Sequence, residues 1–115
     1  MIYRVEILQT ARADLHDAYL AAAHHAPETA RKWADRFLAA LESLTSNPRR
    51  CAIAVESRKA DRELRALLFG RRANKYRAVF TIEGDTVLVL RIRRAQRKPL
   101  TRREIDEALE GDDDN

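Results

Sequence analysis

The chain has 115 residues, which is enough for one domain with its own hydrophobic core. Its single cysteine, Cys51, excludes an internal disulfide, and no Cys/His cluster has the spacing of a zinc site. No segment has the apolar core of a signal peptide or the ~18 apolar residues of a membrane span. We therefore expect a cytoplasmic protein that needs no metal, no cofactor and no membrane.

The net charge of +4 is distributed unevenly along the chain. Residues 49–98 hold 15 Lys and Arg against 5 Asp and Glu, whereas residues 1–48 and 99–115 carry net charges of −1 and −5. A basic block of this size attracts a polyanion or an acidic protein partner. Because the block falls on expected strands, a binding role is favoured over an ordinary solvated surface.

The first half of the chain predicts a strand followed by two helices. Residues 1–8 alternate with the two-residue period of a half-buried strand. Thr10 is placed to cap a first helix over residues 11–25, and Pro27 suits the first turn of a second helix over residues 27–44. The second helix carries a continuous apolar stripe. The two helices should form a hairpin on one face of a sheet.

The second half predicts the rest of the sheet. Residues 46–62 have no clear period and read as a loop. Three strands follow, at residues 63–69, 75–82 and 86–94. Thr101 and Glu104 have capping-box spacing at the start of a short helix over residues 102–110, and residues 111–115 read as a disordered acidic tail. The expected fold is a single α+β domain over residues 1–115. In it a three-stranded antiparallel meander completes one sheet with the N-terminal strand, and the helices lie on one face.

The loop between the last two strands decides which way the arginines point. Ala78 and Phe80 make an apolar face on one strand, and Leu88 and Leu90 make one on the next. Both sets face one core only if the loop has an odd number of residues, as in residues 83–85. A two-residue Gly-Asp turn is the usual hairpin connection, but it would bury an unpaired arginine at a cost of several kcal/mol by rough reckoning. We therefore predict the three-residue loop.

This register gives the sheet a second face, opposite the helices, which carries arginines. Arg77, Arg91 and Arg93 are expected on it. Arg4 and Arg65 join them if their strands alternate as read, and Leu67, Val79, Val87 and Val89 are expected on the same face. An exposed apolar patch with a basic rim is typical of a partner site.

The strand sequences carry a family resemblance. The run Tyr76-Arg77-Ala78-Val79-Phe80, followed by Val87-Leu88-Val89-Leu90-Arg91-Ile92-Arg93-Arg94-Ala95-Gln96-Arg97, resembles the RelE/ParE superfamily of toxins from type II toxin–antitoxin systems. The likeness covers roughly residues 2–100. It implies a small bacterial protein that arrests growth and is held inactive by a co-encoded antitoxin. The antitoxin is then expected to contact Leu67, Val79, Val87 and Val89.

The resemblance leaves two activities open. RelE-like members cut messenger RNA in the ribosome with a cluster of basic side chains, which Arg65, Arg77 and Arg97 match. Leu67 stands where a lysine is expected, and no tyrosine or histidine follows Arg97 as a proton carrier. If cleavage occurs, that carrier is to be sought among His24, His25 and Tyr76.

ParE-like members, whose implied target is DNA gyrase, carry a His-Gly-Arg-Arg-like ending. This chain reads Arg94-Ala95-Gln96-Arg97 at that place. We favour a ParE-like toxin that inhibits growth through a protein target. The residues expected to bind that target are Arg77, Arg91, Arg93, Arg94 and Arg97. The alternatives are a ribosome-dependent mRNA endonuclease and a non-toxic basic module that binds nucleic acid or protein, so whether the chain is an enzyme stays open.

Overall fold

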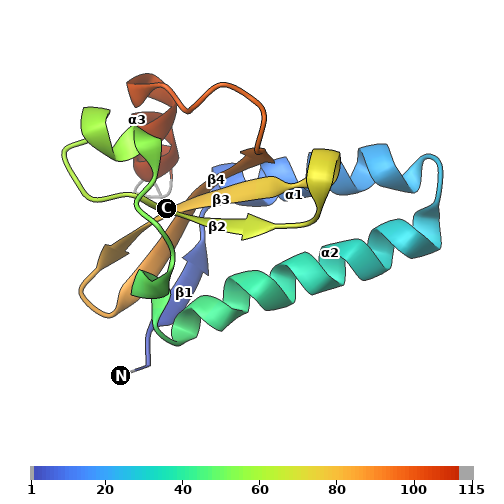
Figure 1. Cartoon of the computed structure of the whole chain (residues 1–115), viewed down its shortest axis with the longest axis horizontal. Helices are drawn as coiled ribbons and strands as arrows, with labels where there is room; N and C mark the ends of the chain where they lie inside the picture. Colours follow the sequence, from blue (N-terminus) through green and yellow to red (C-terminus); the bar gives the residue numbers. More distant parts are fainter. Residues whose placement is uncertain (1, 112–115) are drawn as a thin grey trace.

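The computed structural model describes residues 2–111, and a four-stranded sheet forms its centre (Figure 1). The strands are β1 (Arg4–Ile7), β2 (Arg65–Phe69), β3 (Tyr76–Glu83) and β4 (Thr86–Arg94), and they lie side by side in the order β1-β4-β3-β2. β1 runs parallel to β4, and the other neighbours are antiparallel. The predicted α+β class and the predicted order of elements are confirmed.

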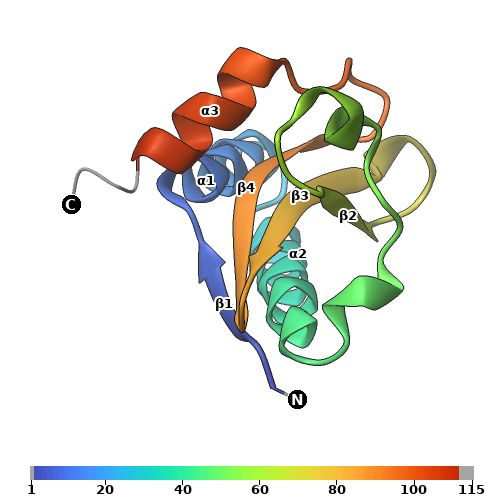
Figure 2. The same cartoon turned by 90° about the vertical axis from the view of Figure 1, so that its left-hand side faces the viewer.

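Helices cover both faces of the sheet. The hairpin of α1 (Gln9–Ala23) and α2 (Pro27–Glu42) packs on one face, and it reaches past the end of the strands (Figure 1). The short helix α3 (Arg102–Gly111) and residues 54–64 of the irregular segment that follows α2 lie over the other face (Figure 2). Gly111 is the last residue of α3, and residues 112–115 of the expected tail lie outside the described residues. Within residues 2–111, no helix is long and apolar enough to cross a membrane.

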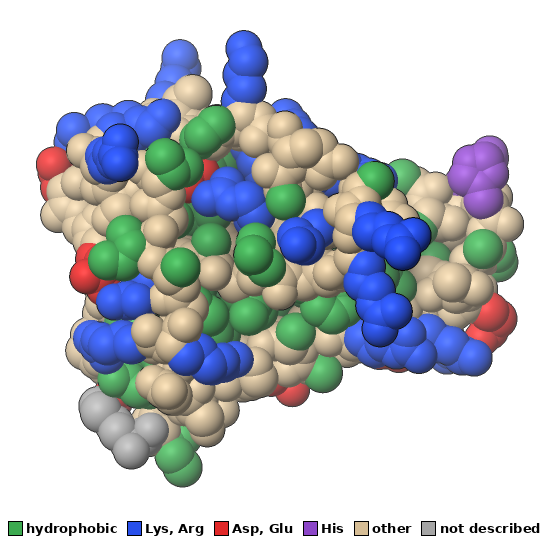
Figure 3. All heavy atoms as spheres, in the orientation of Figure 1, with side chains coloured by type: hydrophobic (Ala, Val, Ile, Leu, Met, Phe, Trp, Pro, Cys, Tyr) green, Lys and Arg blue, Asp and Glu red, His purple; other side chains and the backbone are tan. Residues whose placement is uncertain are grey.

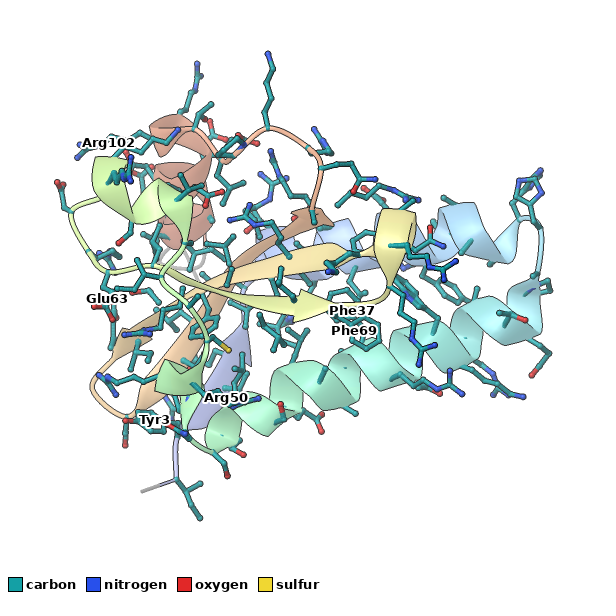
Figure 4. All side chains as sticks on the ribbon, viewed as in Figure 1. Tyr3, Phe37, Arg50, Glu63, Phe69 and Arg102 are labelled. Atoms are coloured by element: carbon teal, nitrogen blue, oxygen red, sulfur yellow. The ribbon has the colours of Figure 1, made fainter. Side chains whose placement is uncertain are left out.

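Each face of the sheet has its own apolar core. Under the hairpin, Phe37 of α2 stacks on Phe69 of β2 with ring centroids 4.5 Å apart (Figure 4). The fully buried members of this first core include Ala11, Phe37, Leu41, Leu44, Ala78, Phe80, Val87 and Val89. Under α3, the fully or nearly buried members of the second core are Leu8, Leu64, Val79, Leu90, Leu100, Ile105 and Ala108.

The hairpin between β3 and β4 differs from the prediction. Glu83 pairs directly with Thr86, so the loop is the two-residue Gly84-Asp85 turn, with Gly84 at a φ of +61°. The expected three-residue loop is wrong. Farther along, Val79 pairs with Arg91 while Phe80 pairs with Val89, which leaves Leu90 as an extra residue in a β-bulge. The bulge restores the register that the turn would otherwise shift by one residue.

Because of this bulge, the side chains of β4 before it point to the opposite face of the sheet from the one predicted. Those after the bulge point to the predicted face. Val87 and Val89 belong to the first core and Leu88 and Leu90 to the second, opposite to the expectation for all four. Beyond the bulge, Arg91 and Arg93 share the face of Arg77, as expected. The prediction assumed that the loop length alone decides which face of the sheet each side chain of the hairpin points to, and a bulge changes this as well.

Two further expectations at the sheet are wrong. Thr10 does not cap α1, because the helix begins at Gln9, and the Thr10 hydroxyl instead donates to the carbonyl of Leu90 in the bulge at 2.7 Å. Arg65 does not join the arginine face. It pairs with Phe80 on the hairpin side, and its guanidinium donates to the backbone carbonyls of Cys51 (2.7 Å) and Arg49 (3.1 Å).

Candidate functional site

Arg77, the central arginine of the second face, is bound by a carboxylate of the same chain. Its two terminal nitrogens donate to the two oxygens of Glu56 at 2.9 and 2.6 Å, and the Glu56 side chain is fully buried. The backbone N–H of Leu100 donates to the same carboxylate at 2.9 Å. Burial alone raises the pKa of Glu56, but these hydrogen bonds and the charge of Arg77 hold the pKa below its ordinary value.

Arg91 and Arg93 are paired in the same way by two helices. Arg91 donates to both oxygens of Asp14 on α1 at 2.7 and 3.0 Å, and this contact raises the pKa of Arg91. Arg93 donates to Glu104 on α3 at 2.6 Å. Burial raises the pKa of Glu104, whereas hydrogen bonds from Thr101 and Arg93 and the charges of Arg93 and Arg91 bring it below its ordinary value.

These ion pairs show that the arginine face has a structural role. The three arginines meet three carboxylates, Asp14, Glu56 and Glu104, which the sequence reasoning did not assign to them. Charge-assisted bonds between partly buried groups hold segments of a fold together. The face is therefore an internal ionic layer that fixes α1, α3 and the segment around Glu56 to the sheet.

A second group of cations, without carboxylate partners, lies at one end of the sheet. Ala95 N–H donates to the carbonyl of Lys75 at 2.8 Å, and the side chains of Arg94 and Gln96 donate to the carbonyl of Ala73. These bonds hold the β2–β3 loop against the chain that follows β4. We call the cations gathered there the basic end, and they are Arg71, Arg72, Lys75, Arg94, Arg97 and Lys98. None of the six has a carboxylate partner within residues 2–111.

A cavity of about 400 Å³ opens beside the basic end, between the hairpin and the end of the sheet. Small alanines of α1 and α2 form one wall, and Trp33 and Tyr76 supply the aromatic part of the lining. Arg94 lies over the Tyr76 ring, 5.3 Å from its centroid, and His25 also lines the cavity. An apolar hollow with a cation at its rim fits a large apolar side chain flanked by acidic ones.

The residues expected to contact an antitoxin are not on a free surface. Val79, Val87 and Val89 are fully buried, Val79 under α3 and the other two under the hairpin. Leu67 packs on the first core, because it pairs with Ala78 rather than lying on the arginine face. The expectation that these four residues share the open face is wrong.

The groups that a nuclease would need are separated by the sheet. Tyr76 and His25, two of the proton carriers considered, line the cavity on the hairpin side. Arg77 lies on the opposite face and is bound to Glu56. Arg65 is held by backbone carbonyls, so among the three candidates Arg97 alone is an exposed cation.

Comparisons with known proteins agree with this architecture. A family model described as the ParE toxin of type II toxin–antitoxin system, parDE, matches residues 5–99. A solved structure described as the chromosomal ParDE TA system from P. aeruginosa superposes with a TM-score of 0.67 at 22% identity, covering 83% of this chain and 98% of that chain. At this identity the structural likeness shows a shared fold. No curated protein sequence matches the chain. Because the family model spans most of the sequence, the chain belongs to the ParE toxin family of type II toxin–antitoxin systems.

Proposed function

We propose that the chain is a toxin that inhibits bacterial growth by binding a protein target such as DNA gyrase, and that a co-encoded antitoxin neutralises it. The observation that carries this proposal is the contrast between the arginines of the second sheet face and the cations of the basic end. Arg77, Arg91 and Arg93 neutralise carboxylates of the chain itself. The cations of the basic end have no such partners, so their charge remains available to a target.

The basic end and its cavity together suit a protein target. Arg94 joins the two, since it belongs to the basic end and also lines the cavity next to Trp33. Interfaces gain most of their affinity from a few aromatic and arginine contacts in a desolvated pocket, and rim charges mainly speed encounter. Arg94 and Arg97 are therefore the residues that we expect to matter most for the target.

The arrangement counts against an mRNA endonuclease. Cleavage without a metal needs a proton carrier and a phosphate-stabilising cation around one scissile bond. Tyr76 and His25 lie on the hairpin side, whereas Arg77 lies on the other side with both terminal nitrogens bound to Glu56. The proposal therefore assigns inhibition to binding and not to RNA cleavage.

The test induces the chain in a bacterium while DNA synthesis and translation are followed separately. Purified protein is then assayed for inhibition of gyrase supercoiling, beside primer extension on cellular messenger RNA. Arg94→Glu and Arg97→Glu should each lower the inhibition of supercoiling at least tenfold. Arg4→Glu reverses an exposed charge at the other end of the sheet, where Arg4 pairs with Thr86 at the start of β4, and should act like the unmodified chain.

Two results would contradict the proposal. Codon-positioned cleavage of messenger RNA that disappears in Arg97→Ala, a change at an exposed residue, would assign the chain to the ribosomal nucleases. Normal growth, with supercoiling unaffected at high protein concentration, would instead favour a non-toxic basic binding module.

A further inference from the structure

The two segments that supply the basic end are tied to each other. One is the loop between β2 and β3, and the other is the chain after β4. The hydrogen bonds that the carbonyls of Lys75 and Ala73 accept join them. Lys75 is half-buried, and the other five cations of the basic end are exposed. The six charges therefore lie on one surface that a ligand can reach.

Acidic side chains are absent from the strands and loops that form the basic end. Residues 64–82 and 86–103 contain no Asp and no Glu. The cavity of about 400 Å³ beside the basic end, and a second hollow of about 290 Å³ that Arg97 helps to line, are both lined without a carboxylate. Figure 3 shows Lys and Arg side chains over the face that carries the β2–β3 loop, with Asp and Glu side chains mainly at its margins. The positive field of the basic end is therefore not cancelled locally.

The opposite end of the sheet carries exposed cations of a different kind. Arg4 lies there beside the start of β4 and forms an ion pair with Glu6. Arg62 forms an ion pair with Glu83, the last residue of β3. A carboxylate in contact with a cation offsets the attraction that the cation exerts on a distant anion. The two ends of the sheet therefore differ in the charge that they present to a polyanion.

Duplex DNA is the polyanion that suits this surface. Lys and Arg side chains that face solvent bind phosphate backbones and carry no sequence information by themselves. Binding of single-stranded nucleic acid gains much of its affinity from aromatic rings on which bases stack. Within residues 2–111, no Phe, Trp or Tyr is exposed, and the half-buried ring of Tyr76 lies under Arg94. The basic end offers charge without a stacking surface, which favours a duplex over a single strand.

We propose that the basic end binds the phosphate backbone of duplex DNA without reading its base sequence. Arg71, Arg97 and Lys98 contact the phosphates, because their side chains are exposed and make no bond within residues 2–111. Arg94 instead holds the carbonyl of Ala73 and so keeps the two segments together. The inference goes beyond the proposed function, since the chain binds DNA whether or not a protein target is present.

The experiment measures binding of the purified chain to fluorescently labelled nucleic acids by fluorescence anisotropy. The probes are two short duplex DNAs of unrelated sequence and a single-stranded RNA of the same length, each at salt concentrations from about 50 to 200 mM. Thermal melts show that every variant is folded.

The variants compare the two ends of the sheet at equal net charge. Arg71→Gln combined with Arg97→Gln removes two cations of the basic end, and Arg71→Gln combined with Lys98→Gln is a second pair of the same kind. Arg4→Gln combined with Arg62→Gln removes two exposed cations from the opposite end and serves as the matched control.

We expect the two duplexes to bind with affinities within threefold of each other. The logarithm of the binding constant should fall against the logarithm of the salt concentration with a slope of about −3 or steeper, a roughly 60-fold loss of affinity between about 50 and 200 mM salt. Each double variant of the basic end should bind at least tenfold more weakly at low salt, and its slope should be shallower by about 2. The control variant should stay within threefold of the unmodified chain.

Three results would overturn the inference: no binding to either duplex at low salt, an equal loss in the control variant, or tighter binding to the single-stranded RNA than to the duplexes. These results are independent of the proposed function. A chain that inhibits gyrase but does not bind DNA would leave the proposed function standing and this inference wrong. A chain that binds duplex DNA through the basic end but affects neither growth nor supercoiling would have the opposite meaning.

Discussion

Glu56 and Arg77 form a bidentate ion pair beneath the chain that leads into α3. The Glu56 carboxylate is fully buried, and it accepts two hydrogen bonds from Arg77 and a third from the backbone of Leu100. Three segments therefore meet at one side chain: the turn at residues 55–59, strand β3 and the loop after β4. Removing one member of such a pair leaves an uncompensated buried charge.

Glu56→Gln should destabilise the fold strongly. The variant keeps the size of the side chain but removes the charge that matches Arg77, so we expect a loss of about 3 kcal/mol in the free energy of unfolding. Urea denaturation followed by circular dichroism measures it. Glu28→Gln breaks an exposed pair with Arg31 and should change stability by less than about 0.5 kcal/mol. Equal losses in the two variants would rule out a special role for the buried pair.

Stability should fall in acid because of Glu56 and Glu104. The pKa of each is held below its ordinary value of 4.5, so the folded chain binds fewer protons there than the unfolded chain. The resulting stabilisation is complete above pH 4.5 and is lost as the pH falls through the lowered values. The free energy of unfolding, measured from pH 7 downward, should therefore decline below that point. The decline should be smaller in Glu104→Gln, and a curve identical to that of the unmodified chain would contradict this explanation.

Gly84→Ala tests the two-residue turn. Gly84 has a φ of +61°, where a Cβ is disfavoured, although no atom lies within 4 Å of the place that the Cβ would take. The cost is therefore backbone strain alone, about 1 kcal/mol. Asp85 does not have a positive φ, so the turn is of type II′, in which the first position favours glycine. A thermal melt that shows no difference between glycine and alanine would argue against the turn.

Arg72→Gly should separate stability from function at the basic end. Arg72 has a φ of +53°, a conformation that costs a residue with a side chain about 1 kcal/mol, so glycine should raise the melting temperature. The same change removes one cation from the basic end and should weaken target inhibition most at low ionic strength. Arg71→Gly is the control. Arg71 is extended, with a φ of −131°, so its loss should weaken inhibition without any gain in stability.

The order of elements could be predicted from the sequence because its signals are local. Pro27 begins α2, and Thr101 and Glu104 form the capping box that the spacing predicts, with bonds of 3.0 and 3.1 Å. The register of β4 could not be predicted in this way. In the bulge, the carbonyl of Leu90 accepts a hydrogen bond from the hydroxyl of Thr10, which is 80 residues away in the chain. No local pattern around Leu90 records that contact.

The carboxylates that bind the arginines could not be predicted from the sequence for a similar reason. Glu56 lies in a segment without periodicity, and Glu104 reads as a capping residue, a role that it also fills. Neither position suggests an ion pair with a strand. The count of charges along the chain correctly indicated a basic region. Only the tertiary structure shows which of its arginines are bound by carboxylates of the fold, as Arg77 and Arg93 are.

The parallel pairing of β1 with β4 has a consequence for how the protein is made. Among the strands of residues 2–111, β1 pairs with β4 alone, and β4 is the last strand of this sheet to leave the ribosome. Until β4 has emerged, the apolar side of the helical hairpin has no complete sheet to cover, and such surfaces recruit other chains. The four-stranded sheet can therefore be completed only after β4 has been synthesised, so β1 and the helical hairpin, which come first in the chain, lack their partner until then.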